Sequence, residues 1–274
     1  MFHAARKFAV WFAAALAAGG CARPEPPAPP ITLDTRGMAP SPGVAELTQV
    51  LKQVVGQDGL VDTTALKAAQ PTLETQLKRM AVTGPTATPR LYRTPEEALA
   101  YWYNALAGWS MELLLLEGCP CGPLGARQRS RRFPLDGRMM SLAEIGQLLA
   151  RDEDFRTAVA APGISPVDAH MPTTPFEAED IREKVLERFG QFLADRERFL
   201  IDAARRQVLV PPVLWQFRER LIRSYHQTYH VTGATMGTAL LPHVSGRALR
   251  RVQDAVGYRY VEATPDCLAE FHDQ

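Results

Sequence analysis

The sequence has almost no excess of charge of either sign. Its 31 lysines and arginines nearly balance 30 aspartates and glutamates, which leaves a formal net charge of +1. Proteins that bind nucleic acid carry a basic surface, because they contact the phosphates through lysine and arginine. The even balance therefore argues against a nucleic-acid partner. The hydrophobic fraction of 46% and the charged fraction of 22% are those of an ordinary globular protein.

Several sequence signatures of catalysis are also missing. The chain has no glycine-rich phosphate-binding loop and no serine nucleophile elbow. It has no internal repeat either, which argues against a solenoid or a propeller. No motif of this kind therefore assigns the chain to a class of enzyme.

The hydrophobic run at the N-terminus is too short to cross a bilayer. It extends from Phe8 to Ala18, whereas a membrane-spanning helix needs roughly 20 apolar residues. Two basic residues precede the run, and Gly19 and Gly20 follow it. A basic start, a short apolar core and small residues at the exit are typical of a secretory signal peptide. We therefore expect residues 1–20 to be removed on export.

Cys21 follows the two glycines directly. This order resembles the lipobox of bacterial lipoproteins, in which the cysteine is acylated, although Ala18 stands where leucine is usual. Several acyl chains anchor a protein stably, whereas one holds it only marginally. Ala22 rather than aspartate comes next, which by resemblance to enterobacterial sorting rules indicates the outer membrane. The resemblance implies a bacterial envelope protein that faces the periplasm and is anchored in the lipid bilayer through Cys21. The alternative is an ordinary signal beside a bystander cysteine.

Only three other cysteines are present, namely Cys119, Cys121 and Cys267. An odd number in an exported protein implies a free thiol or an intermolecular bridge, although an oxidising compartment favours disulfides. A bond between Cys119 and Cys121 would be strained, because one residue separates them. Pairing of either one with Cys267 remains open.

The segment over residues 21–42 is rich in proline. Proline removes backbone donors and favours the extended polyproline conformation. We therefore expect an unpacked, semi-rigid tether over residues 21–42 and one globular domain over residues 43–274.

The most hydrophobic segment of the domain extends from Ala98 to Leu116. Thr94 before it is a favoured N-cap, and Glu97 stands at the capping-box position. A helix that is apolar nearly all round is buried in the core. This interpretation predicts that replacing Trp102 by alanine destabilises the fold severely, by roughly 3–5 kcal/mol.

Hydrophobic periodicity and turn residues indicate the remaining elements. The expected helices are 44–55, 66–80, 141–149, 181–192, 213–225 and 248–256, and the expected strands are 133–135, 138–140, 199–201, 208–210 and 257–261. Asp136-Gly137 predicts a hairpin turn, and Pro71 is expected either to kink the second helix or to split it. The sequence thus predicts an α+β fold, a mainly helical single domain with a few short strands and hairpins.

Three phrases resemble the domain of unknown function 547 family, and they occur in the family's order. They are Gly59-Leu60-Val61-Asp62-Thr63, then Glu97-Ala98-Leu99-Ala100-Tyr101-Trp102-Tyr103-Asn104-Ala105, and then Ser141-Leu142-Ala143-Glu144-Ile145. The resemblance covers most of the chain from Gly43 onward and implies that family's fold.

The chain departs from this family where typical members carry a histidine and two cysteines. Ala158 stands at the place of the histidine and Gly163 at that of the first cysteine. Pro166 follows Ser165, with no second cysteine near. A histidine beside a cysteine lowers the thiol pKa and supports nucleophilic chemistry. The departures imply a degenerate member without that chemistry.

Asn104 lies within the hydrophobic helix, where its amide needs partners. It either orients a ligand or an oxyanion beside a cleft, or it ties the backbone of a neighbouring loop to the core, as most buried amides do.

His226 and His230 are four residues apart, a spacing that suits two metal ligands on one helical face. Asp168 or His170 would have to supply a third ligand. The alternative is a solvated pair that stacks beside neighbouring tyrosines.

Four arginines, Arg127, Arg129, Arg131 and Arg132, follow the glycine-proline loop. Close to a tethered N-terminus, they either touch anionic lipid head groups or form a solvated loop.

We expect a non-catalytic or degenerate envelope lipoprotein that binds an envelope protein or a cell-wall component and holds no cofactor. The alternative is a thiol-type hydrolase or transferase that uses Cys119 or Cys121. Both cysteines follow the predicted C-terminal end of the long helix, where the helix dipole opposes a thiolate. A third hypothesis is metal-dependent activity at His226 and His230.

Overall fold

The computed structural model describes residues 28–118, 126–165 and 168–263. Its α-helices are α1 (Ala45–Val54), α2 (Thr63–Val82), α3 (Pro95–Glu117), α4 (Ala126–Ser130), α5 (Leu142–Ala150), α6 (Arg156–Val159), α7 (Ile181–Ala194), α8 (Pro212–Trp215), α9 (Arg218–Tyr229), α10 (Met236–Leu240) and α11 (Gly246–Asp254). Two 3-10 helices are η1 (Pro89–Leu91) and η2 (Leu241–His243), and the strands are β1 (Phe133–Leu135), β2 (Arg138–Met140), β3 (Leu200–Asp202), β4 (Gln207–Val210) and β5 (Arg259–Glu262). The α+β, mainly helical fold class is confirmed.

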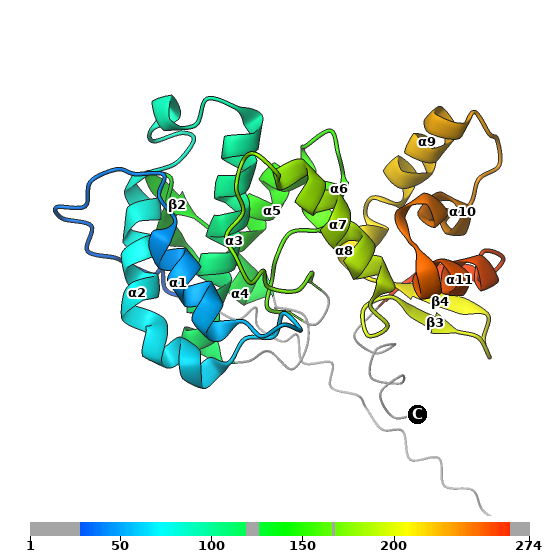
Figure 1. Ribbon diagram of the computed structural model, residues 1–274, viewed down its shortest axis with the longest axis horizontal. Coiled ribbons are helices and arrows are strands. Elements are labelled where there is room, and N and C mark those ends of the chain that lie inside the picture. Colours follow the sequence, from blue (N-terminus) through cyan, green and yellow to red (C-terminus); the bar gives the residue numbers. More distant parts are fainter. Residues whose placement is uncertain (1–27, 119–125, 166–167, 264–274) are drawn as a thin grey trace, which may run out of the picture.

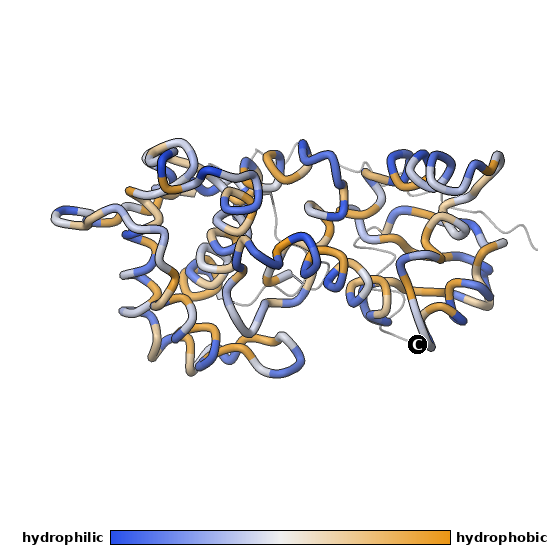
Figure 2. Tube along the Cα trace, turned by 45° about the horizontal axis from the view of Figure 1, so that its top comes forward, coloured by the Kyte–Doolittle hydropathy of each residue, from blue (hydrophilic) through white to orange (hydrophobic). Residues whose placement is uncertain are grey.

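The domain is elongated, with α1, α2 and α3 at one end and α9, α10 and α11 at the other (Figure 1). β1 and β2 form an antiparallel hairpin, as Asp136-Gly137 predicts. At the other end β3 pairs antiparallel with β4, and β4 pairs parallel with β5. Hydrophobic and hydrophilic residues alternate along the helices in Figure 2, as burial of one side requires. Most of the buried hydrophobic side chains form one continuous cluster.

The long helix α3 is buried, as its composition predicts. The Thr94 hydroxyl accepts a hydrogen bond from the Glu97 N–H, and the Glu97 carboxylate accepts one from the Thr94 N–H, which completes the capping box. In the middle of α3, Trp109 is fully buried and stacks on Phe133, with ring centroids 4.1 Å apart. α3 therefore contributes a stacked aromatic pair to the core through Trp109.

The prediction that Trp102 is a core residue is wrong. Tyr101 and Tyr103 on either side of it are buried, whereas Trp102 is half-buried and packs against the core from outside the buried cluster. A helix that is apolar nearly all round offers no periodicity to distinguish its innermost aromatic ring from one at the rim.

Pro71 does not split the second helix. α2 is continuous from Thr63 to Val82, and Asp62 caps it by accepting hydrogen bonds from the N–H groups of Thr64 and Ala65. Pro71 faces solvent, so the backbone carbonyl one turn before it can be satisfied by water.

The N-terminal segment does not form an unpacked tether as far as residue 42. Ile31 is buried, and its N–H donates to the Arg132 carbonyl at 2.8 Å. Arg131 Nε donates to the Pro29 carbonyl at 3.1 Å, and the Ser41 N–H donates to Thr83 Oγ1 at 3.0 Å. The predicted tether is therefore wrong from Pro29 onward, because the side chains of Ile31 and Leu33 and these backbone groups hold the segment on the domain.

Within the ranges that the structure covers, no helix has the length and hydrophobicity to cross a membrane. The predicted signal peptide and Cys21 lie outside those ranges.

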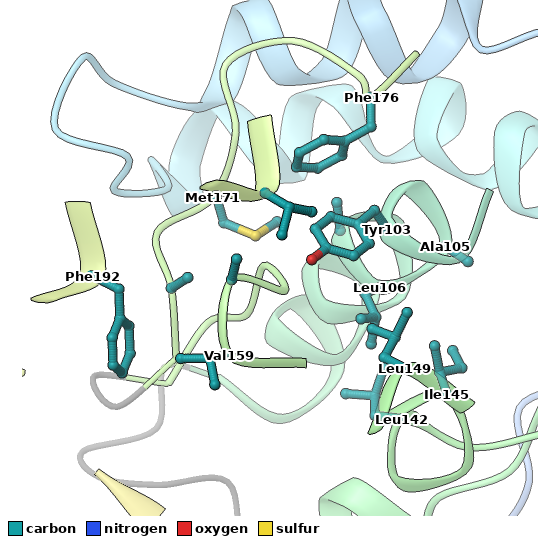
Figure 3. Packing of buried hydrophobic residues seen from close by; sticks show 14 of the residues in the cluster. Tyr103, Ala105, Leu106, Leu142, Ile145, Leu149, Val159, Met171, Phe176 and Phe192 are labelled. Atoms are coloured by element: carbon teal, nitrogen blue, oxygen red, sulfur yellow. The ribbon is translucent and has the colours of Figure 1, made fainter. Parts of the chain in front are cut away.

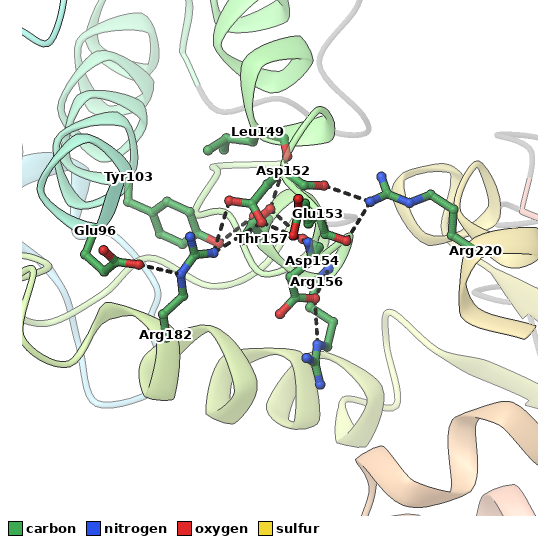
Figure 4. A network of polar contacts seen from close by, with 10 residues as sticks. All are labelled: Glu96, Tyr103, Leu149, Asp152, Glu153, Asp154, Arg156, Thr157, Arg182 and Arg220. Atoms are coloured by element: carbon green, nitrogen blue, oxygen red, sulfur yellow. Dashed lines mark hydrogen bonds and ion pairs between the residues drawn. The ribbon is translucent and has the colours of Figure 1, made fainter. Parts of the chain in front are cut away.

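A polar network holds the segment between α5 and α6 (Figure 4). The Arg220 guanidinium of α9 donates to the carbonyls of Ala150, Asp152 and Glu153 at 3.0, 2.7 and 2.8 Å. Arg182 of α7 forms ion pairs with Asp152 at 3.0 Å and with Glu96 of α3 at 3.2 Å. This segment is therefore fixed by helices that are distant from it in the sequence.

Candidate functional site

A cleft of about 460 Å³ lies beside α5 and α6. Its apolar wall includes Leu106 of α3, Leu142 and Leu149 of α5, and Val159 of α6, which Figure 3 shows within the packed core. Its polar lining consists of Ser110, Arg129, Gln147, Ser165, Asp168 and Gln216. The cleft thus combines an apolar wall with several polar groups, as small-molecule sites do.

The structure brings Ala158 and Gly163 together in this cleft. These are the two positions at which the resemblance expects a histidine and a cysteine. Neither side chain present can transfer a proton or attack a substrate. Pro162 and Ala169 form a parallel bridge across the loop, and the Gly163 N–H donates to the Ala169 carbonyl at 3.1 Å. Backbone pairing therefore sets the position of Gly163.

The Asp168 side chain lies directly against Gly163. A Cβ atom on residue 163 would come within 2.3 Å of Asp168 Oδ2 and 2.6 Å of Asp168 Cβ, closer than real contacts allow. The same carboxylate accepts a hydrogen bond from the Ser165 N–H at 3.2 Å. Only glycine therefore fits at residue 163 while Asp168 keeps this position.

Among the described residues that line the cleft, Asp168 is the one that carries a carboxyl group. Burial raises its pKa, and the positive charge of Arg129 and the Ser165 N–H lower it by less. Burial therefore disfavours its ionised form, and a cation placed opposite would favour that form.

His170 belongs to a different cluster. Its Nε2 lies 3.0 Å from Asp195 Oδ2, and Arg198 contacts both side chains. Burial raises the pKa of Asp195, but its contacts with His170 and the Glu197 N–H and the charge of Arg198 outweigh burial and hold it below its usual range. Arg198 also donates to the Asp168 carbonyl. This cluster supports the loop that carries Asp168, and His170 does not line the cleft.

Asn104 ties a loop to the core. Its Nδ2 donates to the Phe176 carbonyl at 2.9 Å, and its Oδ1 accepts from the Phe176 N–H at 2.8 Å. Both strong hydrogen-bonding sites of the amide face one backbone unit, so the geometry supports the structural interpretation. Asn104 does border a separate cavity of about 280 Å³, lined by Tyr101 and Phe176 among others.

His226 and His230 are not brought together with a third ligand. The Ala234 N–H donates to His226 Nε2 at 3.2 Å. His230 is the exposed, left-handed C-cap of α9. Nowhere in the described part of the chain do three or more histidine, cysteine, aspartate or glutamate side chains form a group able to hold a metal ion.

The thiol candidates Cys119 and Cys121, and Cys267, lie outside the described residues. Of the arginine cluster, Arg131 pairs with Glu117 at 2.8 Å and Arg132 with Glu144 at 2.8 Å, while Arg129 lines the cleft.

Sequence reasoning considered Asp168 only as a metal ligand and Arg129 only as part of a basic loop. The turn around Ser165 and Asp168 is readable from the residue types, but its approach to Gly163 and to α5 depends on packing between segments far apart in the chain.

We expect Gly163→Ala to destabilise the domain by about 1–3 kcal/mol, the usual cost of overpacking. The loss should be smaller in an Asp168→Gly background, where the atoms that clash with the new Cβ are gone. Chemical denaturation of the four proteins in this cycle measures the coupling. Gly146→Ala in α5 is the control, because a Cβ there meets no atom within 4 Å. Additive losses would show that Asp168 does not occupy this space.

Comparisons with protein-family models, with curated proteins and with solved structures each found no match. The resemblance to the domain of unknown function 547 family therefore stays a prediction. The proposed function below rests on the residues that line the cleft.

Proposed function

We propose that the chain is a membrane-anchored envelope lipoprotein whose domain binds a ligand non-catalytically in the cleft beside α5 and α6. The anchor is the acylated Cys21 that the N-terminal sequence predicts. The domain is a degenerate relative of the domain of unknown function 547 family, in which the site of a histidine and a cysteine has become a binding site.

The observation that carries this proposal is the carboxyl group of Asp168 against Gly163. The space that a cysteine side chain at residue 163 would need is filled by the Asp168 carboxyl group. Ala158, on the same cleft, has no proton to transfer. The arrangement supports recognition of a charged group and does not support thiol chemistry at this place.

The charges favour a ligand that carries an ammonium group. Burial raises the pKa of Asp168, which means that ionising this carboxyl group costs free energy. A cation bound opposite the carboxylate offsets that cost. Arg129, on the same lining, suits a carboxylate of the same ligand. Stem peptides of the bacterial cell wall offer both groups, since they contain carboxylates and often a diamino acid with a free amine. We therefore infer a cell-wall peptide as the ligand.

Calorimetric titration of the unacylated full chain (Cys21→Ser) with a soluble disaccharide tetrapeptide from peptidoglycan tests the proposal. We expect saturable binding that weakens at least about tenfold in Asp168→Asn, because the amide keeps the acceptor for the Ser165 N–H but loses the charge. Asp58→Asn is the matched control, since Asp58 also accepts a backbone N–H, that of Leu60, but is exposed. Absence of binding, or equal binding by Asp168→Asn, would overturn the proposed ligand.

A further inference from the structure

A second hollow lies on the outer side of α5, between this helix and the hairpin β1–β2. It has a volume of about 460 Å³ and is lined by Arg132, Arg138, Met139, Met140, Glu144, Gln147, Leu148 and Arg151. We call it the arginine hollow. Gln147 also lines the cleft of the proposed ligand site, so the two features lie on either side of one helix.

The arginine hollow carries a positive charge that its own residues do not neutralise. Glu144 is its one acidic lining residue, and it pairs with Arg132 at 2.8 Å. Arg138 and Arg151 are exposed, and over the described ranges neither guanidinium has an ion-pair partner. Met139, on the same lining, exposes 36% of its surface. Two free guanidinium groups around an exposed apolar side chain fit a surface that presents phosphates above hydrocarbon.

The chain enters the domain at this face. The Ile31 N–H donates to the Arg132 carbonyl at 2.8 Å, and Arg131 Nε donates to the Pro29 carbonyl at 3.1 Å. Eight peptide steps separate Pro29 from Cys21, and they span at most about 28 Å when fully extended. If Cys21 is acylated, as the proposed function assumes, the arginine hollow stays within this distance of the bilayer.

We propose that the arginine hollow docks on the membrane that holds the lipid anchor and takes the phosphate groups of anionic phospholipids. Arginine suits this ligand, because its planar guanidinium donates two parallel hydrogen bonds to phosphate oxygens. One face of the domain then lies against the head groups, and the proposed ligand cleft opens on the other side of α5.

Sedimentation with vesicles tests the docking without the anchor. The unacylated full chain (Cys21→Ser) should bind vesicles of phosphatidylglycerol and phosphatidylcholine, and binding should fall at least about tenfold with phosphatidylcholine alone. Arg138→Glu with Arg151→Glu should cause a similar loss. Arg247→Glu with Arg250→Glu makes the same charge change on exposed residues of α11 at the opposite end of the molecule (Figure 1) and should leave binding nearly unchanged.

Equal losses in the two double variants would overturn the proposal, because net charge alone would then account for binding. Equal binding to both vesicle types would overturn it as well. If charge reversal prevents folding, Arg138→Gln with Arg151→Gln decides between the same outcomes. Titration with the cell-wall peptide separates this test from the proposed function, since the hollow's arginines do not line the ligand cleft.

Discussion

Replacing Trp109 by alanine should destabilise the domain by about 3–5 kcal/mol, the usual cost of removing a buried aromatic side chain. The indole is fully buried and stacks on Phe133 at an interplanar angle of 15°. Its loss therefore leaves a cavity between α3 and the hairpin β1–β2 and removes a ring contact as well. Because small domains have limited total stability, we expect thermal unfolding to shift strongly downward or the chain to be recovered unfolded.

Two variants make this result specific. Trp109→Phe keeps a stacked ring and removes an indole N–H that has no hydrogen-bond partner within the described residues. This variant should therefore lose much less free energy of unfolding than Trp109→Ala. Trp102→Ala should also cost less than Trp109→Ala, because Trp102 is half-buried. If Trp102→Ala proved the more damaging of the two alanine variants in urea denaturation, the assignment of the core would be wrong.

Asn104→Ala should cost about 2–6 kcal/mol, because it leaves the N–H and the carbonyl of Phe176 without partners in the core, at about 1–3 kcal/mol for each. Chemical denaturation measures the loss. Gln76→Ala is the control, since the buried Gln76 amide donates to a single backbone carbonyl, that of Gly43 at 3.1 Å, and should cost less.

The alternative role for Asn104 gives a different result. A residue that orients a ligand can be replaced with little loss of stability, since functional groups are often not optimal for the fold. A cost below about 1 kcal/mol for Asn104→Ala would therefore contradict the structural role and return attention to the cavity that Asn104 borders.

The sequence predicted those elements whose ends are marked by capping or turn residues. The box formed by Thr94 and Glu97 marks the start of α3, and Asp136-Gly137 marks the hairpin. The short helix α10 was missed, because five residues capped by Thr235 and Thr238 are too few to show a periodicity. The expected helix over residues 213–225 is broken near Phe217 into α8 and α9. The Phe217 ring is buried, and no proline or glycine at this position indicates the break in the sequence.

The candidate site was less predictable than the fold. Ala158 and Gly163 could be singled out from the sequence, but what faces them depends on tertiary packing. Asp168 approaches Gly163 through a bridge between Pro162 and Ala169, and Arg198 holds the same loop from beyond α7. Such contacts join segments that are separated in the sequence, and the residue types alone do not show that these segments lie close together.

The contacts of Arg220 also bear on the order in which the domain can fold during synthesis. The Arg220 guanidinium donates to carbonyls at the C-terminal end of α5 and just after it. These partners, Ala150, Asp152 and Glu153, lie some seventy residues earlier in the sequence. A chain made from its N-terminus emerges with α5 long before α9. The carbonyl of Ala150, which lines the ligand cleft, therefore gains this partner only after Arg220 has emerged, so a protein truncated before α9 would lack this support beside the cleft.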